Sequence, residues 1–543
     1  MPAFDRVADV VVLGAGAAGL PAAIAARDAG ASVLVLEANH DIGGHAMLSG
    51  GNVRLGGGTS WQRRYGVEDS PDLVFLELTD PHHPQFRRND REIVRAFADE
   101  SVPTFDFLVE NGVAFQEQPP VFGRFGTIPR VYHTPPSSKD FADSINGSGG
   151  SGLMRDLERS ARRKGASILL RHRFVKLVRE SGRVVGVVAE TRGAAVRIGA
   201  RRGVVIATGG HSSNVAFRRM FDARLTEEYQ VAGEPWTQQN ADGELAALAI
   251  GAALWGVGIQ ANDSERSIGG GTTLVRPGFI GCRYGYHGTY WDVRSPMFAK
   301  AGASGLAVSD LQDVILVDQE GKRFHDELDT SVEFLSACLG PHGNLGHDER
   351  PVNGGGPIWA IFDTAAALRE RWTTQPPHVD PDGWFFTADT IGDLARAIRN
   401  PYQRRPIRPR TLEETVDRYN EIVDLGTDPD FGRPAPLGGQ RIAALRGYKI
   451  ERPPFFAAWS TPIVHDSLSG LRIDTHARVL GWNGNVLPGL FCAGESAGGF
   501  GLHGLSRAIV FGRIAGATAA ALPEAPELAD GAAVLDLHVG EPS

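Results

Sequence analysis

Cysteine is scarce in this chain of 543 residues, and its three cysteines, Cys282, Cys338 and Cys492, are too far apart to form a CxxC or CxxCH motif. Iron–sulfur clusters and c-type haem require closely spaced cysteines, and a disulfide framework requires paired ones. The sequence therefore supports none of these classes and predicts no metal site. Because a reducing compartment suits such a chain, we expect it to be cytoplasmic.

Positive charge is not in excess either. The formal net charge is −9, and no basic stripe with interleaved aromatic residues is present, which argues against nucleic acids and anionic membranes as partners. The apolar run Val10–Ala26 is interrupted by glycines and follows no basic segment. We therefore interpret it as a buried strand, turn and helix and not as a signal or membrane segment.

A glycine-rich turn follows a short β-branched run near the N-terminus. Asp9–Leu13 is typical of a buried parallel strand, and it leads directly into residues 14–19, GAGAAG, which match the GxGxxG pattern. These glycines allow a tight turn, close approach of a pyrophosphate and close packing of the following helix. Glu37 ends a second strand, expected at 32–36, where its carboxylate can bind ribose hydroxyls. The pattern predicts a Rossmann-type dinucleotide site.

A second glycine-rich loop distinguishes between the possible dinucleotides. The first turn alone fits NAD(P) as well as FAD. Residues 43–52, GGHAMLSGGN, add backbone that can approach a longer cofactor beyond its pyrophosphate. We therefore expect FAD.

The order of these motifs resembles the flavoprotein superfamily of soluble FAD-dependent fumarate reductases and 3-ketosteroid Δ1-dehydrogenases. Further blocks extend the resemblance over nearly the whole chain: GVVIATGG at 203–210, NADG at 240–243, VILVDQEGKRFHDE at 314–327, LEETVDRYN at 412–420, GLRID at 470–474, and GLFCAGE to VFGRIAG at 489–516. The resemblance implies an α/β fold, with a Rossmann-type FAD-binding domain (parallel sheet plus β-meander) and an inserted α+β cap that binds the substrate.

The length of the chain exceeds the range in which one core keeps growing, so we expect two interlocked domains. Residues 276–451 change in character: they have proline-rich connections, aromatic clusters and an expected helix at 411–424, but no cofactor motif. We assign 276–451 to the cap, 1–275 to the first part of the FAD-binding domain and 452–543 to its C-terminal part.

The motifs and the resemblance together give the expected FAD-binding residues. Glu495 would bind ribityl hydroxyls, although a solvated surface acid is the alternative. A helix that starts near Ser506 would direct its N–H groups at the flavin ring. Val175 would touch adenine through its backbone. The full set is Gly14, Gly16, Ala17, Ala18, Gly19, Glu37, Ala38, Gly43, Gly44, His45, Ser49, Gly50, Gly51, Val175, Thr208, Gly209, Gly210, Asp242, Gly494, Glu495, Ser506 and Ile509.

His45 raises the question of a covalent link. It follows the glycine pair where, in membrane-bound succinate dehydrogenases, a histidine is bonded to the 8α carbon of the flavin. Most soluble relatives lack this bond. We expect FAD to be bound non-covalently with His45 facing it, and a covalent link is the alternative.

Residues that bind a dicarboxylate in the fumarate reductases are missing. No arginine lies four positions after Glu327, Asp466 stands in the place of a substrate-binding histidine, and the loop at 500–507 is shortened. Two carboxylates need two cationic partners, and Arg507 could replace only one. A C4 dicarboxylate is therefore not expected as the substrate.

Ketosteroid dehydrogenases use tyrosines and a glycine amide to remove an α proton and polarise a ketone. Tyr284, Tyr286 and Tyr290 cluster in the expected cap, and each could instead fill the gap between cap and FAD-binding domain. The family's TYPGPGG loop is absent, and His503 and Gly504 occupy its place. These two could polarise a carbonyl, or His503 could simply cap the following helix.

Three functions therefore stay open. The first is an FAD-dependent dehydrogenase that introduces a double bond α,β to the carbonyl of a cyclic ketone smaller than or different from a steroid. The second is an enoate reductase of the fumarate-reductase type, with Arg507 or Arg441 as the carboxylate clamp. The third is a flavin electron-transfer subunit. In each enzymatic case the partners are a small-molecule substrate and an external electron acceptor, either oxygen, a quinone or a dye.

Overall fold

The computed structural model describes four long ranges of the chain. Tyr284, Tyr286, Tyr290, Arg441 and His503 lie outside the described residues, as does the expected domain boundary after residue 275. The described residues are 4–255, 314–327, 356–432 and 447–525, apart from 84–85, 124–125, 140–145, 224, 232, 235, 377–378, 380, 461–462, 465 and 503.

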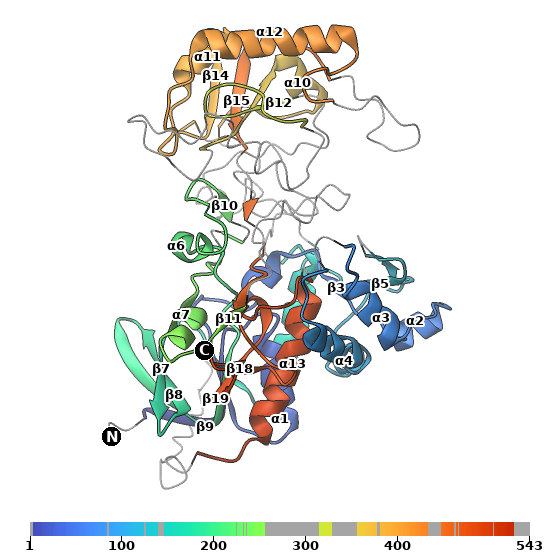
Figure 1. Cartoon of the computed structure of the whole chain (residues 1–543), viewed down its shortest axis with the longest axis vertical. Coiled ribbons are helices and arrows are strands. Elements are labelled where there is room, and N and C mark those ends of the chain that lie inside the picture. The colour runs from blue at the N-terminus through green and yellow to red at the C-terminus, as the bar shows by residue number, and fades with distance from the viewer. Residues whose placement is uncertain are drawn as a thin grey trace.

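A largely parallel sheet forms the centre of the FAD-binding domain (Figure 1). Its strand order is β18-β19-β9-β1-β2-β6, and all neighbours along it are parallel except β18 and β19. Residues 10–13 of β1 are fully buried, as expected for a strand covered on both faces. The strands are β1 (Arg6–Leu13), β2 (Val33–Leu36), β6 (Ser167–Leu169), β9 (Ala194–Ile206), β18 (Arg478–Leu480) and β19 (Val486–Cys492).

The expected β-meander branches from this sheet. β7 (Arg173–Glu180) pairs antiparallel with β8 (Arg183–Thr191), which pairs antiparallel with the first half of β9. The second half of β9 lies between β1 and β19. One strand of 13 residues therefore belongs to both the meander and the parallel sheet.

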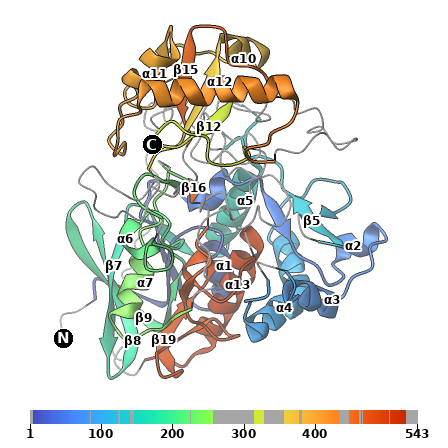
Figure 2. The same cartoon turned by 45° about the horizontal axis from the view of Figure 1, so that its top comes forward.

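A small antiparallel sheet lies beside the N-terminus of the last helix. Its strands have the order β3-β5-β4. Three helices, which lie between β3 and β4 in the chain, are on the same side of the domain as this sheet (Figure 2). The buried Arg130 of β5 is held by Asp69, with two nitrogen–oxygen distances of 2.7 Å, and by Glu77 at 2.9 Å. The elements are β3 (Asn52–Arg54), β4 (Val121–Phe122), β5 (Pro129–His133), α2 (Ser60–Arg64), α3 (Pro71–Leu78) and α4 (Arg91–Glu110).

The cap is a second α/β unit, seen at the top of Figures 1 and 2. Its antiparallel sheet has the order β12-β13-β15-β14 and buries a separate apolar cluster on each face. The helix predicted at 411–424 is confirmed as part of α12. The elements are β12 (Ile315–Val317), β13 (Trp359–Asp363), β14 (Phe385–Ala388), β15 (Phe455–Trp459), α10 (Thr364–Arg369), α11 (Ile391–Ala397) and α12 (Pro409–Leu425).

One expected boundary of the cap needs correction. We placed its end at residue 451, but β15 follows that residue and pairs with both β13 and β14. The apolar run FFAAW that forms β15 completes the core of the cap sheet, because all five residues are buried. The chain therefore returns to the FAD-binding domain after Trp459.

Short strand pairs join the outgoing and returning chain between the two units. β10 (Gln230–Val231) pairs with β16 (Ile463–Val464), and β11 (Leu254–Trp255) pairs with β17 (Gly470–Leu471). Arg404 of the cap also lies 3.6 Å from Glu227 in the preceding loop. Two short helices, α6 (Val215–Arg218) and α7 (Asp242–Leu248), belong to the outgoing segment.

Within the described part of the chain, no helix combines the length and the apolar character that crossing a membrane requires.

Two helices meet in backbone contact against the central sheet. α1 (Gly19–Asp28) lies beside α13 (Leu505–Ala521), and α5 (Gly149–Arg163) packs on the other side of α1. A Cβ atom on Gly512 would lie 2.2 Å from the Ala18 oxygen, and one on Gly516 would lie 2.0 Å from the Ala22 oxygen. Only glycine therefore allows α13 to lie this close to α1.

We predict that Gly516→Ala destabilises the protein. Glycine to alanine in a helix is normally favourable by about 1 kcal/mol. Here the new methyl group would force the helices apart, which should cost about 1–3 kcal/mol. Urea unfolding followed by circular dichroism should give a lower midpoint than the parent, while Ala517→Ser at the exposed neighbouring position should change it little. An unchanged or higher midpoint for Gly516→Ala would contradict the packing described.

Candidate FAD and substrate site

A cavity of about 760 Å³ runs from the end of β2 to the N-terminus of α13, which is a typical size for a cofactor pocket. Most of the predicted FAD-binding residues line it, together with Gly504. They are Gly14, Gly16, Ala17, Ala18, Glu37, Ala38, Gly43, Gly44, His45, Ser49, Gly50, Thr208, Gly209, Asp242, Gly494 and Glu495.

Glu37 marks the adenosine end of this cavity. Its carboxylate accepts hydrogen bonds from the backbone N–H groups of Ala15 and Asn39, both at 2.8 Å, so the acid is fixed against the glycine-rich turn. Burial raises the pKa of Glu37, while these backbone hydrogen bonds act in the opposite direction. Phe174 and Trp236 line the same end. We expect the ribose and the adenine ring to lie between the fixed carboxylate and these apolar side chains.

The glycine-rich turn has the geometry that a pyrophosphate needs. Gly14 has a φ of 102°, and a Cβ atom there would lie 2.3 Å from the Ala207 oxygen. A Cβ atom on Gly19 would lie 1.8 Å from the Gly14 oxygen, so Gly19 keeps helix α1 close to the strand. At Gly16, by contrast, the nearest atom to a Cβ would be the Gly43 oxygen at 3.7 Å. Gly16 thus leaves a space that is open to the cavity, at the N-terminus of α1.

The opposite end of the cavity is formed by the N-terminus of α13. Gly504 precedes this helix with φ 96° and ψ −162°, a conformation accessible to glycine, and Leu505 and Ala508 line the cavity with it. The free N–H groups of the first turn therefore face an electron-rich group placed there. If Glu37 binds the ribose, as we expect, the order of groups in FAD would put the isoalloxazine ring at this end.

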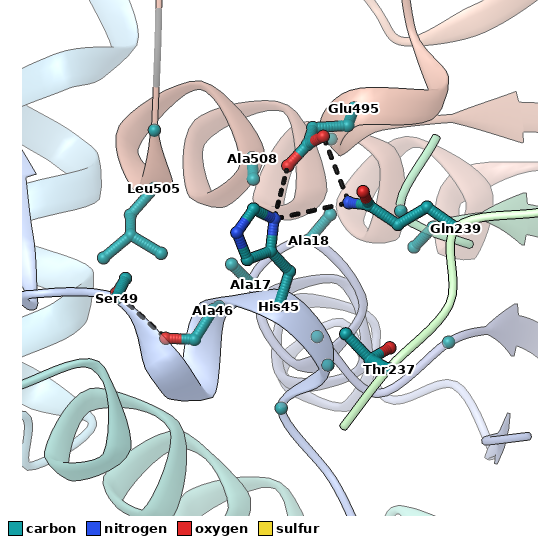
Figure 3. Close-up of a pocket in the computed structure, with 18 of the residues that line it drawn as sticks. Ala17, Ala18, His45, Ala46, Ser49, Thr237, Gln239, Glu495, Leu505 and Ala508 are labelled. Carbon is teal, nitrogen blue, oxygen red and sulfur yellow. Dashed lines mark hydrogen bonds and ion pairs between the residues drawn. The ribbon is translucent and has the colours of Figure 1, made fainter. Parts of the chain in front are cut away.

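Between the two ends, side chains from three distant segments converge (Figure 3). His45 projects from the short helix η1 (Gly44–Leu48), and its Nδ1 lies 3.6 Å from Glu495 Oε1 and 3.4 Å from Gln239 Nε2. Gln239 Nε2 also donates to Glu495 Oε2 at 3.2 Å, and the Ser467 N–H donates to the same oxygen at 3.1 Å. Glu495 is thus part of a hydrogen-bonded wall and not a solvated surface acid.

Several predicted residues lie behind the cavity wall. The hydroxyl of Ser506 accepts a hydrogen bond from the Arg54 N–H at 2.6 Å, and Ser506 does not line the cavity. Ile509 is fully buried, and Val175 is 51% exposed, whereas its neighbour Phe174 lines the cavity. Three glycines of the set, Gly19, Gly51 and Gly210, shape the turns without lining the cavity.

Arg507 is placed differently from what a carboxylate clamp requires. It is 2% exposed, and its guanidinium donates to the backbone oxygens of Phe500 at 2.6 Å and Ser467 at 3.0 Å. Burial lowers the pKa of Arg507, while Glu495 and Asp466 act against this shift. The side chain therefore fixes the loop before α13 in this structure and does not line the cavity.

Other cavity residues were missed at the level of sequence. Gln239 directly precedes the NADG block, so its position next to a cofactor motif could have indicated that it lines the cavity. Asn52 and Arg54 follow the second glycine loop on β3, and His133 lies opposite on β5. Nothing in the sequence pattern indicates that pairing, because Asn52 and His133 are 81 positions apart and β5 carries no cofactor motif.

The fold and the site together define a flavoprotein that binds FAD across the carboxyl ends of a parallel sheet. A family model described as FAD binding domain matches residues 9–256 and 295–508, and the chain belongs to this family. It is an FAD-dependent oxidoreductase of the group that contains fumarate reductases and steroid dehydrogenases, as the sequence predicted.

Three similar proteins illustrate this relationship. NADH:acrylate oxidoreductase of Vibrio harveyi is 27% identical over 96% of this chain, which spans about half (51%) of that protein. The open conformation of a flavocytochrome c3 fumarate reductase has a TM-score of 0.67 at 25% identity, covering 95% of this chain and 78% of that one. A 3-ketosteroid-Δ4-(5α)-dehydrogenase from Rhodococcus jostii RHA1, solved with 4-androstene-3,17-dione, has a TM-score of 0.57 at 26% identity, covering 96% and 98%.

We predict that Gly16→Ala weakens FAD binding without weakening the fold. Its methyl group meets no protein atom closer than 3.7 Å, but it occupies the space beside the expected pyrophosphate. Fluorescence titration of the apoprotein with FAD should give a dissociation constant at least about tenfold higher than for the parent, a loss of about 1.4 kcal/mol. The melting temperature of the apoprotein should stay within about 1–2 °C, as for a change without buried strain. Unchanged affinity would contradict the placement of the phosphates.

We further predict that FAD is released when the protein is denatured. His45 Nδ1 faces Glu495 and Gln239, and we expect the imidazole to contact the cofactor without bonding to it. Acid precipitation followed by filtration should leave the yellow colour in the filtrate. Colour retained by the protein in the parent, but lost in His45→Ala, would instead establish a covalent link.

Proposed function

We propose that the chain is a dehydrogenase that removes two hydrogens from adjacent carbons of a neutral cyclic ketone, α,β to its carbonyl. The observation that carries this proposal is the negative charge along the cavity. Asp466 and Glu495 both line it, and one oxygen of each, together with a His45 nitrogen, lies within 4.8 Å of the others. Two carboxylates side by side would repel a carboxylate substrate, whereas a neutral ketone carries no such penalty.

The arginines support the same choice. Of those that line the cavity in the described parts of the chain, Arg54 is paired with Glu77, and Arg173 is paired with Asp242 at 2.9 Å. Arg507 holds backbone oxygens. A dicarboxylate would need two available guanidinium groups, and these three are already committed.

Different residues of the chain would then remove the proton and polarise the ketone. FAD, when bound, supplies an acceptor for a hydride from the β carbon. We assign removal of the α proton to one of Tyr284, Tyr286 and Tyr290 of the cap, and polarisation of the ketone to His503 and the Gly504 amide. Gly504 lines the ring end of the cavity, so its N–H can reach a carbonyl placed there. Closing of the cap would exclude water from the reacting carbons.

A second function, an enoate reductase, is favoured by the relatives. NADH:acrylate oxidoreductase and a fumarate reductase are named for acids with a C=C bond. In that case the reduced flavin would transfer the hydride to carbon, and Arg441 would have to bind the carboxylate, since Arg507 is committed to the loop. The electron acceptor or donor is external in both proposals.

The two proposals predict opposite optical changes. Under anaerobic conditions, at least one of a set of neutral cyclic ketones, with steroids included only for comparison, should bleach the oxidised flavin band at about 450 nm. Acrylate or fumarate should leave the dithionite-reduced protein colourless. Recolouring by the enoates alone would overturn the dehydrogenase proposal in favour of the reductase. If neither set of compounds changes the absorbance, both proposals fail and the electron-transfer function is supported. Heat-denatured protein containing FAD serves as the control.

A further inference from the structure

An imidazole and an amide lie opposite each other in the wall of the FAD cavity. Asn52 of β3 and His133 of β5 are partners in the antiparallel register, and both line the cavity. Their side chains are joined at 2.6 Å between Asn52 Oδ1 and His133 Nδ1. Because an amide oxygen only accepts, this contact places a hydrogen on Nδ1. In the neutral ring, Nε2 is then the nitrogen that can accept a proton. Nε2 has no partner among the described residues.

The pair lies at the ring end of the cavity. Arg54, two residues after Asn52, donates its N–H to Ser506 in the first turn of α13. Ser49 and Gly50, just before Asn52, line the same cavity as Gly504 and Leu505. The strand that carries Asn52 is therefore attached to the helix N-terminus that faces the isoalloxazine ring, and the adenosine end at Glu37 is remote from it.

The protonation of His133 can respond to a charge that is added to the cavity. Burial lowers the pKa of His133, so the imidazole is neutral at neutral pH while the cavity holds no added charge. Three ion pairs join charged groups of the neighbouring β3, β5, α3 and the loop before α3. They are Arg54 with Glu77, Arg130 with Asp69 and Arg130 with Glu77. Asp72 of α3 pairs with Arg95 of α4, and His45, Asp466 and Glu495 also line the cavity.

We propose that His133, oriented by Asn52, contacts the isoalloxazine ring and gives the reduction potential of the bound FAD part of its pH dependence. A protonated imidazole beside the ring stabilises the negative charge that arrives on reduction. Asn52 acts as a positioning residue, because it holds the ring of His133 in one orientation. This inference concerns the cofactor and needs no substrate, so it stands or falls independently of the proposed dehydrogenase reaction.

Two-electron reduction of the flavin is coupled to the uptake of protons. Dithionite supplies two electrons, the ring takes up one proton from water at N5, and the ring then carries one negative charge. That charge raises the pKa of His133, and the imidazole binds a second proton from water when the pH lies between its pKa values in the oxidised and reduced protein. The stabilisation is fully present below the lower of the two pKa values and is lost as the pH rises through the higher one.

The test is a series of redox titrations of the holoprotein with dithionite and dye mediators, between about pH 5.5 and pH 8.5, which spans the histidine range. The parent should favour the reduced flavin at least tenfold more than His133→Gln at the acid end, which is about 30 mV for a two-electron couple. The difference should fall to nearly zero at the alkaline end. A difference that stays constant with pH, or no difference at all, would overturn the proposal.

Two further variants keep the test decisive. His476→Gln removes an exposed histidine that does not line the cavity, and its potentials should follow the parent at every pH. Asn52→Leu keeps His133 but removes the acceptor for its Nδ1–H. At the acid end, the difference in potential between Asn52→Leu and His133→Gln should be at least threefold smaller than that between the parent and His133→Gln. If His133→Gln fails to retain FAD, the same comparison between the parent and Asn52→Leu decides, and parent-like potentials in Asn52→Leu would overturn the assigned role of the pair.

Discussion

The close contact between helices α1 and α13 is the constraint on which the site depends. Ala18, at the start of α1, is in contact with Gly512 of α13 and with Gly494 just after β19. A Cβ atom on Gly512 would lie 2.2 Å from the Ala18 oxygen, and one on Gly494 would lie 3.0 Å from the Ala18 Cβ. Because both helices begin at the cavity, their contact brings two helix N-termini to one ligand. In the expected placement of FAD, the phosphates and the electron-rich end of the flavin would each face free N–H groups and a positive dipole end.

This constraint explains how segments far apart in sequence form one cavity. β19 continues into Glu495, and β9 continues into Thr208 and Gly209, so parallel neighbours deliver both groups to the same edge of the sheet. Glu495 is then fixed by Gln239, from the segment that leads to the cap, and by Ser467, from the segment that returns from it. The insertion of the cap between these crossings therefore leaves the cofactor site intact.

The parts of the site that follow a strand end could be predicted from the sequence. Glu37, the GAGAAG turn and the AGE block each come directly after a recognisable strand, and a parallel sheet brings such positions together. His133 could not be found this way, since its role depends on pairing with Asn52 across an antiparallel ladder that no local pattern specifies. Likewise β15 reads as an ordinary apolar run, and its membership in the cap sheet is fixed only by its partners β13 and β14.

Arg507 shows why residue type alone misleads about substrate. An arginine in the first turn of α13 is close to the flavin in sequence, yet a buried guanidinium must satisfy its donors, and here two backbone oxygens of the preceding loops do so. Among the described residues, Asp466 and Glu495 line the cavity, and Arg507 interacts with both from behind its wall. The same buried cation that stabilises the loops is therefore not available as a carboxylate clamp, which supports the proposal of a neutral carbonyl substrate.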